Sequence, residues 1–386
     1  MRPRVLFVNG GILGLLSFHQ FLQRMLPTQS AIEWEHILLT EGLTLRARAV
    51  RRLLATRLWK DGLLGVSNLD LARFRLELFA GLLARHRIRG AGRCDVIHFH
   101  RQATAYGSLD LMRRVPCVVS FDCTQECVVA PAGPLERRTY LPNVLMDGAI
   151  FRRAAALVAT SRWAADSLRA YYPDCDAPVH VLASPVPIDW FDAAWIEQRQ
   201  RRAISGAKPR FLFVGGDFPR KGGYDLLETW EAGLFHTRAT LDLVTDWPIE
   251  RPLPPGVFRY SGIRSQTPAW AERWAAADVF VLPTRNDARP NALQEAAAAG
   301  LAAIATRTCA VPEIVADGET GLLVDVGDHV ALAQAMDRLI ASAPLRHTLG
   351  RQARAWIEQI ADPVAYLAKL IAILLEAARH GAPRRA

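Results

Sequence analysis

Apolar positions along the chain gather in short runs that alternate with longer stretches of helical period. Runs of four or five β-branched and aromatic residues are typical of buried strands, and their alternation with helices predicts βαβ units and a mostly parallel sheet. The pattern occurs twice. The strands predicted in the first half are Val5–Val8, Val96–Phe99, Cys117–Phe121, Ala156–Ala159 and His180–Ala183. Those predicted in the second half are Arg210–Val214, Thr240–Val244, Val279–Leu282 and Ala302–Ala305.

The periodicity breaks between Pro185 and Lys208, where two prolines and a charged run interrupt it. We place a linker there and predict two α/β domains, the first over residues 1–190 and the second over residues 191–363. The apolar helix predicted over residues 364–380 has nothing after it to pack against in its own half. We therefore expect this helix to pack back on the first domain.

Composition excludes several classes of protein. With 51% hydrophobic and 22% charged residues over 386 positions, the chain is neither disordered, nor collagen-like, nor a small disulfide-stapled domain. Residues 1–190 hold 24 basic and 16 acidic residues, whereas residues 191–386 hold 23 and 22. The positive first half favours an anionic partner, either a membrane surface or an anionic acceptor. No zinc-finger, basic-zipper or aromatic ribonucleoprotein pattern accompanies the charge, so we do not expect nucleic acid.

The six cysteines show no spacing typical of a disulfide framework, which favours free thiols in a reducing cytoplasm. Cys123 and Cys127 alone do not supply the two cysteine pairs of a zinc ribbon. No apolar run reaches the roughly 18 residues of a membrane span. We therefore predict a cytoplasmic protein, with peripheral attachment to the inner face of the cytoplasmic membrane as an open alternative.

Residues 43–60 predict a basic amphipathic helix, with six basic residues beside an apolar set at helical spacing. Such a helix can lie on an anionic bilayer. It can equally be a surface helix that packs on its own sheet, and the sequence leaves both interpretations open.

A glycine-rich basic loop, residues 215–223, follows the strand predicted at Arg210–Val214 and reads G-G-D-F-P-R-K-G-G. Glycines let backbone amides approach phosphate oxygens, while Arg220 and Lys221 supply charge, so the segment predicts an anion cradle. It is neither a P-loop nor a dinucleotide-binding G-x-G-x-x-G. A tight turn with two solvated cations is the alternative.

A second candidate anion site follows the strand that ends at Leu282. A loop carries Asp287, and a helix starts near Pro290, so the first amides of that helix point outward with its positive dipole end. Glu295 lies one turn inside the helix, so the two carboxylates can hold hydroxyls on two parts of one ligand. Alternatively, Glu295 only favours the helix start and Asp287 only makes a turn.

Together the two segments resemble the retaining glycosyltransferases of family 4, the glycosyl transferases group 1. In that family an acidic residue and a glutamate flank seven others in a segment that ends E-A-x-A-x-G, and Asp287, Glu295 and Gly300 take those places here. Residues 311–324 and the stretch Asp95–His100 resemble further landmarks of the family. The resemblance implies the GT-B fold, in which two Rossmann-like domains face each other across a cleft.

The resemblance also implies a role for each matching residue. Lys221 would hold the donor diphosphate, Glu295 the nucleotide ribose and Asp287 the transferred sugar. The remaining donor-side positions implied by the family pattern are Gly10 and Gly11 across the cleft, Gly216 and Arg220 in the basic loop, Ile263 near the base, and the amides of Asn291 and Ala292 at the phosphates.

Three positions depart from the family pattern. Gly216 stands where the family usually has arginine, so Arg220 is the candidate substitute. Asp287 stands where glutamate is commoner. Asp122 stands where many members carry a histidine near the reacting sugar, so it either replaces that histidine as a catalytic group or is structural.

The implied reaction moves a sugar from a UDP- or GDP-linked donor to a glycan or lipid-linked acceptor in bacterial polysaccharide or glycoconjugate synthesis. Its main requirement is to stabilise the growing charge on the diphosphate, which Lys221 and a helix start can meet. We therefore expect no metal and no cofactor. His98 and His100 are weak candidates for acceptor contact, or else packed side chains.

Two other functions stay open at this point. The first is a non-catalytic nucleotide-sugar-binding partner subunit of the same fold, which Gly216 and Asp122 would permit. The second is a Rossmann-type dehydrogenase, which the absence of G-x-G-x-x-G after either first strand disfavours.

Overall fold

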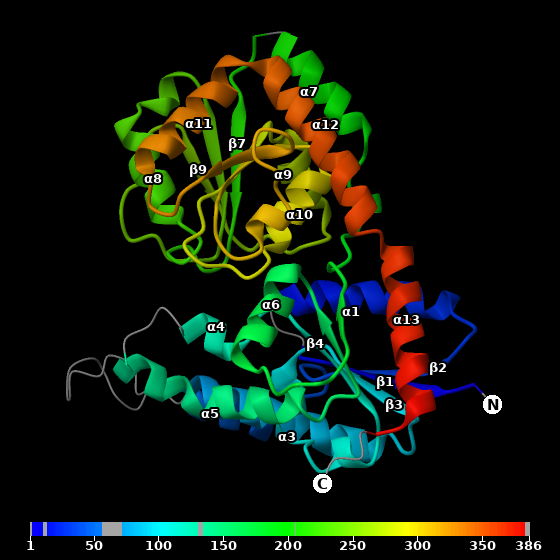
Figure 1. Cartoon of the computed structure of the whole chain (residues 1–386). Helices are drawn as coiled ribbons and strands as arrows, with labels where there is room; N and C mark the ends of the chain where they lie inside the picture. The colour runs from blue at the N-terminus through cyan, green and yellow to red at the C-terminus, as the bar shows by residue number, and fades with distance from the viewer. Residues whose placement is uncertain (1, 11–13, 56–71, 130–133, 205, 383–386) are drawn as a thin grey trace. The chain divides into compact units, whose positions relative to one another are not determined.

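A computed structural model describes residues 2–10, 14–55, 72–129, 134–204 and 206–382, and it divides into two compact units (Figure 1). Unit 1 comprises Met1–Ser184 together with Val364–Ala386, and unit 2 comprises Pro185–Pro363. The boundary falls where the predicted linker begins, at Pro185, a few residues before the predicted position. The last helix belongs to unit 1.

Unit 1 is built on a six-stranded parallel sheet with the order β2-β1-β3-β4-β5-β6. Because β2 and β3 lie on opposite sides of β1, the strand order reverses there, which is where open α/β sheets bind ligands. Its strands are β1 (Arg4–Asn9), β2 (Glu33–Leu38), β3 (Val96–Phe99), β4 (Cys117–Phe121), β5 (Ala156–Ala159) and β6 (Val179–Val181). Its helices are α1 (Gly14–Met25), α2 (Leu45–Leu54), α3 (Ala72–Gly90), α4 (Gln125–Val129), α5 (Pro134–Phe151), α6 (Arg162–Tyr171) and α13 (Pro363–His380).

Alternate residues of each central strand of unit 1 enter two separate cores, one on each face of the sheet. Leu6 and Val8 of β1 join the core that α3, α5 and α6 cover. Val5 and Phe7 join the opposite core, to which α1 and α13 contribute. Leu367, Leu370 and Leu374 of α13 are almost fully buried there, so the last helix is an integral layer of unit 1.

Unit 2 repeats the architecture with the strand order β12-β11-β10-β7-β8-β9. Here the order reverses between β7 and β10, which pair in parallel. Its strands are β7 (Arg210–Val214), β8 (Thr240–Val244), β9 (Val257–Tyr260), β10 (Val279–Leu282), β11 (Ala302–Thr306) and β12 (Gly321–Val324). Its helices are α7 (Ala194–Ile204), α8 (Gly223–Ala232), α9 (Pro268–Ala276), α10 (Asn291–Ala298), α11 (His329–Ala341) and α12 (Ala343–Ile360).

The predicted linker is wrong at its charged run, because that run forms helix α7. Arg199 is 8% exposed and donates to three backbone carbonyls, those of Ala277 (2.7 Å), Ala299 (2.6 Å) and Trp274 (2.9 Å). These carbonyls lie at the carboxyl ends of α9 and α10, where a cation is favoured by the helix dipole. One charge of the run that suggested a solvated linker, Arg199, is therefore a buried contact of unit 2.

The basic helix predicted over residues 43–60 is described only as far as residue 55. Helix α2 starts at the cap Thr44, whose hydroxyl accepts from the amide of Ala47, and none of its residues is buried. Leu45 and Leu53 are 82% and 71% exposed. On the predicted apolar face, however, Leu43, Ala47 and Leu54 are half-buried, so the described residues leave both interpretations open.

Candidate active site

The two motifs of the second half lie at one edge of the unit 2 sheet. The basic loop follows β7 and the Asp287 loop follows β10, and these neighbouring parallel strands end side by side. The loops are also joined directly, because the carbonyl of Arg220 accepts from the amide of Arg285 (2.9 Å) and the hydroxyl of Thr284 (3.3 Å). The predicted residues of the two motifs are thus brought together at the switch point of the sheet.

Two glycines allow this contact between the loops. Gly222 has φ +74°, and a Cβ atom there would lie 1.9 Å from the carbonyl oxygen of Pro283. A Cβ atom on Gly215 would lie 2.7 Å from Cδ of Lys221. These glycines therefore make room for the facing loop and for the Lys221 side chain, whereas exposed Gly216 has open space around it.

Charged side chains of the two loops form a small network. Nζ of Lys221 lies 3.3 Å from Oδ2 of Asp287, and both side chains are 16% exposed. Arg220 donates to Asp217 (2.9 Å) and to the carbonyl of Asn286 (2.5 Å), and its Nη1 lies 3.7 Å from Asp287. Arg220 therefore joins the loops, while Lys221 is the more enclosed cation.

Helix α10 begins with its first amides unused. Its cap is Pro290, which offers no side-chain hydrogen bond. The amide of Leu293 donates to the Pro290 carbonyl (3.1 Å), whereas the amides of Asn291 and Ala292 have no acceptor in the described part of the chain. Of the first three amides, which the sequence led us to expect free, that of Leu293 is therefore bonded, and the other two are the pair implied by the family pattern.

Glu295 lies one turn inside α10 and is 8% exposed. Burial raises the pKa of this carboxyl group to about 8, and the opposing effect of the Lys221 charge only partly reverses it. No donor among the described residues reaches its carboxylate. A buried acid without a partner, beside a cation, is typical of a ligand site.

The region expected to hold the base contains an acid that we did not predict. Asp246 accepts from the amide of Gly262 (2.6 Å) and from Arg264 (2.8 Å). These bonds, led by that of the Gly262 amide, lower the pKa of Asp246. Ile263 is half-buried and packs against the unit 2 core. The signal that we passed over was an acid two residues beyond the carboxyl end of β8.

A further acid also went unnoticed in the sequence. Asp225, in the first turn of α8, is paired through both oxygens with Arg285 (2.6 and 2.9 Å). Asp225, Glu228 and His329 bring ligand atoms within 4.8 Å of one another beside a concavity of about 540 Å³. Since Arg285 already neutralises Asp225, we assign no metal to this cluster.

In unit 1, the predicted residues lie at the carboxyl ends of neighbouring strands. Gly10 follows β1, and Gly11 lies outside the described residues. Asp122 directly follows β4, and Arg101 follows β3. Although burial opposes it, the carboxylates of Asp122 and Glu77 raise the pKa of Arg101. Arg101 therefore provides a firmly charged neighbour for Asp122 that sequence reasoning missed.

His98 and His100 differ in environment. His98 is fully buried, its Nε2 lies 2.8 Å from the Ser120 hydroxyl, and burial lowers its pKa to about 3. The ring of His100 stacks on Phe18 with 3.5 Å between centroids. In the structure both are packed side chains, the second of the alternatives that the sequence left open.

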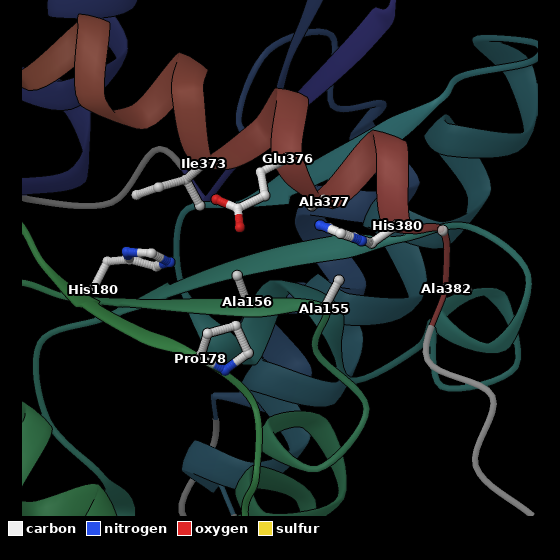
Figure 2. Close-up of a pocket in the computed structure, with 10 residues that line it drawn as sticks. Ala155, Ala156, Pro178, His180, Ile373, Glu376, Ala377, His380 and Ala382 are labelled. Atoms are coloured by element: carbon white, nitrogen blue, oxygen red, sulfur yellow. The ribbon is translucent and has the colours of Figure 1, made fainter.

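A separate cavity of about 320 Å³ lies at the opposite end of the unit 1 sheet (Figure 2). It is lined by α13 and by residues at the amino ends of β5 and β6, among them His180, Glu376 and His380. None of the predicted site residues reaches it.

All six cysteines are free thiols. In the described ranges, no helix combines the length and the apolar character that a membrane span requires.

Solved structures place this architecture in a known class. The chain superposes on sucrose-phosphate synthase from Thermosynechococcus elongatus with a TM-score of 0.73 at 17% identity, covering 97% of this chain and 100% of that one. It superposes on HepE from Anabaena, solved in complex with UDP-glucose, with a TM-score of 0.68 at 16% identity and 97% and 100% coverage. The fold is therefore that of the two-domain GT-B glycosyltransferases.

Sequence comparisons narrow the class to a family. The model described as Glycosyltransferase Family 4 matches residues 42–190, and the model described as Glycosyl transferases group 1 matches residues 208–342. The chain belongs to glycosyltransferase family 4, and the dehydrogenase alternative is set aside.

Curated relatives match the chain over parts of their length. The lipopolysaccharide core biosynthesis glycosyltransferase LpsE of Rhizobium meliloti is 29% identical over 37% of this chain and 43% of its own length. A D-inositol 3-phosphate glycosyltransferase of Xylanimonas cellulosilytica is 27% identical over 75% of this chain and 74% of its own. The match thus spans less than half of the first of these relatives.

Proposed function

We propose that this protein is a retaining, metal-independent hexosyltransferase that uses a nucleotide-diphosphate sugar in bacterial polysaccharide or glycoconjugate synthesis. The observation that carries the proposal is the arrangement of Lys221, Asp287 and Glu295 around the start of α10, at the switch point of the unit 2 sheet. The cation and the two unused amides there suit a diphosphate, and the two acids suit hydroxyls of the ribose and of the sugar.

In this proposal, Lys221 and the amides of Asn291 and Ala292 bind the diphosphate, and Glu295 accepts hydrogen bonds from ribose hydroxyls. Asp287 exchanges its contact with Lys221 for a hydroxyl of the transferred sugar. UDP is the first nucleotide to test, because HepE was solved with UDP-glucose.

Transfer breaks the bond between the anomeric carbon and the diphosphate oxygen, and the electron pair leaves with the diphosphate. Lys221 and the dipole of α10 stabilise this charge as it grows. The acceptor oxygen bonds to the anomeric carbon on the face that the diphosphate leaves, and its proton passes to the departing phosphate oxygen. Asp122 takes the place of the histidine that many family members have near the sugar.

We propose a lipid-linked or glycan acceptor and contact with an anionic membrane surface through α2. The support is the exposure of Leu45 and Leu53 beside Arg46, Arg51 and Arg52 on one short helix. Flotation with vesicles containing 30% anionic lipid tests this: wild type floats, Leu53→Glu does not, and the matched unit 2 variant Leu234→Glu still floats. Equal flotation of all three would refute the contact.

A non-catalytic sugar-nucleotide-binding subunit is the second candidate function, favoured by Gly216 and Asp122 standing where the family has arginine and histidine.

One assay separates the two functions. The protein is incubated with UDP-glucose, UDP-N-acetylglucosamine or GDP-mannose, with and without short lipid-diphosphate saccharides, in buffer containing EDTA. The enzyme releases nucleotide diphosphate and forms an α-linked product, whose anomeric configuration NMR reports. Binding of a donor without any release of nucleotide would favour the subunit.

A further inference from the structure

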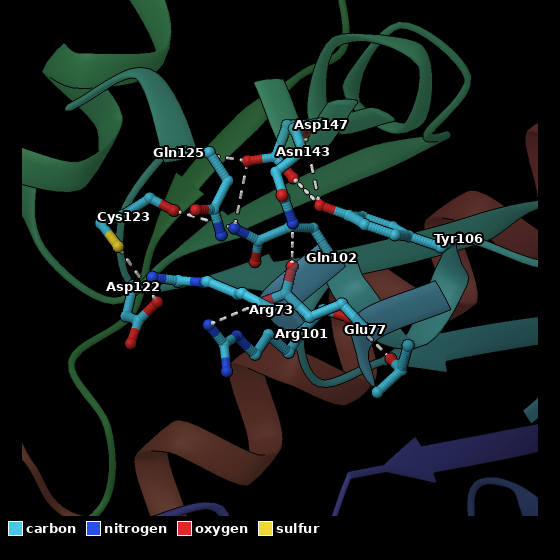
Figure 3. A network of polar contacts seen from close by, with 11 residues as sticks. Arg73, Glu77, Arg101, Gln102, Tyr106, Asp122, Cys123, Gln125, Asn143 and Asp147 are labelled. Carbon is cyan, nitrogen blue, oxygen red and sulfur yellow. Dashed lines mark hydrogen bonds and ion pairs between the residues drawn. The ribbon is translucent and has the colours of Figure 1, made fainter. Parts of the chain in front are cut away.

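The loop that carries Asp122 is held by two side chains buried beneath it (Figure 3). Nε2 of Gln102 donates to the carbonyl of Cys123 (2.9 Å). Oδ2 of Asp147, in α5, accepts from the amide of Gln125 (3.0 Å). The two anchored backbone groups belong to residues one and three positions after Asp122, so together they fix the path of the chain as it leaves Asp122.

Both anchors are enclosed. Asp147 is fully buried and Gln102 is 1% exposed, so neither can reach a substrate. They are also joined to each other, because Gln102 donates weakly to Asp147 (3.4 Å), and Tyr106 donates to the other carboxylate oxygen (2.9 Å). Asp147 therefore receives three hydrogen bonds and gives none, which requires an acceptor at that position.

We propose that Asp147 is a positioning residue for sugar transfer, acting with Gln102 to hold Asp122 in place at the acceptor-side end of β4. This inference rests on the proposed function and deepens it. A buried carboxylate that accepts three hydrogen bonds is far more favourable than an unpaired one, so Asp147 and Gln102 favour one arrangement of the Cys123 and Gln125 backbone groups.

The charge environment gives the proposal a pH dependence. Groups facing Asp147 are Glu77 from α3, Arg101 after β3, Tyr106, Cys123 and Tyr172. Burial raises the pKa of Asp147 to about 7, against the hydrogen bond from the Gln125 amide. Protonation turns one oxygen of this carboxyl group into a hydrogen-bond donor, although all three of its partners are themselves donors. We therefore expect these hydrogen bonds to weaken, and the Asp122 loop to loosen, as the pH falls below about 7.

Four variants separate positioning from general stability. Asp147→Leu removes the hydrogen bonds that Asp147 accepts from the Gln125 amide, from Gln102 and from Tyr106. Asp147→Asn places an amide donor among the donors of Gln102, Tyr106 and Gln125, as the protonated carboxyl group does. Tyr106→Phe removes a bond of the same network that does not reach the loop. Gln102→Met, which removes the second anchor, serves if Asp147→Leu does not fold.

The measurements are steady-state transfer and amide exchange at Gln125 by NMR. We expect Asp147→Leu and Gln102→Met to lower kcat about 10-fold or more, with unchanged KM for the donor and faster Gln125 exchange, as for the loss of a charged hydrogen bond. Asp147→Asn mimics the protonated acid, so we expect it to lower kcat at pH 8 toward the low-pH level of wild type and to lose the fall in kcat below pH 7, whereas Tyr106→Phe stays within about 2-fold.

Wild-type kcat in Asp147→Leu or Gln102→Met, or an equal loss in Tyr106→Phe, would overturn the positioning role. Unchanged Gln125 exchange in Asp147→Leu would overturn it even without an activity assay. A wild-type protein that transfers no sugar under any of these conditions would instead refute the proposed function.

Discussion

Lys221 and Asp287 form an ion pair, Nζ to Oδ2 3.3 Å, that joins the loops after two neighbouring parallel strands. Both side chains are mostly buried, so the pair is shielded from solvent and holds the lysine at a defined position before any ligand binds. If the proposed function holds, a donor diphosphate meets a cation already in place, which lowers the cost of ordering it.

The first prediction concerns this cation. Lys221→Ala should lower kcat/KM for the donor about 100-fold, because loss of one group that stabilises developing charge typically costs that much. Arg220→Ala should cost less, since its guanidinium is already bonded to Asp217 and Asn286. Initial rates of nucleotide release measure both. A larger loss for Arg220→Ala would reverse the assignment of the principal cation.

The second prediction tests the contact between the loops. Gly222→Ala should destabilise the protein by at least roughly 1–3 kcal/mol, the usual cost of a strained backbone, because the new Cβ would also meet the Pro283 carbonyl. Gly216→Ala is the matched control for stability, since nothing lies near its Cβ. Urea unfolding reports both values, and equal midpoints for the two variants would contradict the geometry.

Much of the fold could be predicted because central strands of parallel sheets are continuous apolar runs. The bounds of β3, β4, β5, β7, β8 and β10 are as predicted. The missed strands β2, β9 and β12 lie at the sheet edges. Two of them, β2 and β9, mix exposed charged residues with buried ones, which hides their period. The helix at residues 194–204 was missed because the buried partners of Arg199 lie far away in the chain.

The residues of the candidate site also divide into those that the sequence predicts and those that only the fold brings together. Lys221, Asp287 and Glu295 could be predicted because each lies in a local motif with recognisable spacing. The anchors Gln102 and Asp147 could not, since Gln102 lies in a short 3-10 helix after β3 and Asp147 lies in α5, and they meet the Asp122 loop only in the folded unit. His98 looked available in the sequence, but the sheet encloses it.

The third prediction follows from the buried arginine of α7. Arg199→Met should lower the free energy of unfolding by about 3 kcal/mol or more, because each buried carbonyl left without a donor costs about 1–3 kcal/mol. Arg201→Met, on the exposed side of the same helix, should change it by less than about 1 kcal/mol. Guanidinium titrations compare them. If the two variants are equally stable, Arg199 does not secure α9 and α10.

The fourth prediction uses the raised pKa of Glu295. In the ligand-free protein the folded state binds this proton more tightly than the unfolded chain does. The contribution of Glu295 to stability therefore falls as the pH rises from about 4.5 to about 8, and it levels off above that. Glu295→Gln should remove this part of the pH dependence, whereas Glu319→Gln, at an exposed position, should leave it unchanged. Thermal unfolding at pH 5 and pH 8 measures the difference, and parallel curves for wild type and Glu295→Gln would exclude it.

The most direct test of the donor site is calorimetric titration of UDP and GDP into wild type and into Glu295→Ala at pH 8. We expect wild type to bind one of the two nucleotides and Glu295→Ala to bind it about 10-fold or more weakly, as loss of a charged hydrogen bond to ribose requires. Equal affinity in the two proteins, or no binding of either nucleotide to wild type, would contradict the assignment of this site.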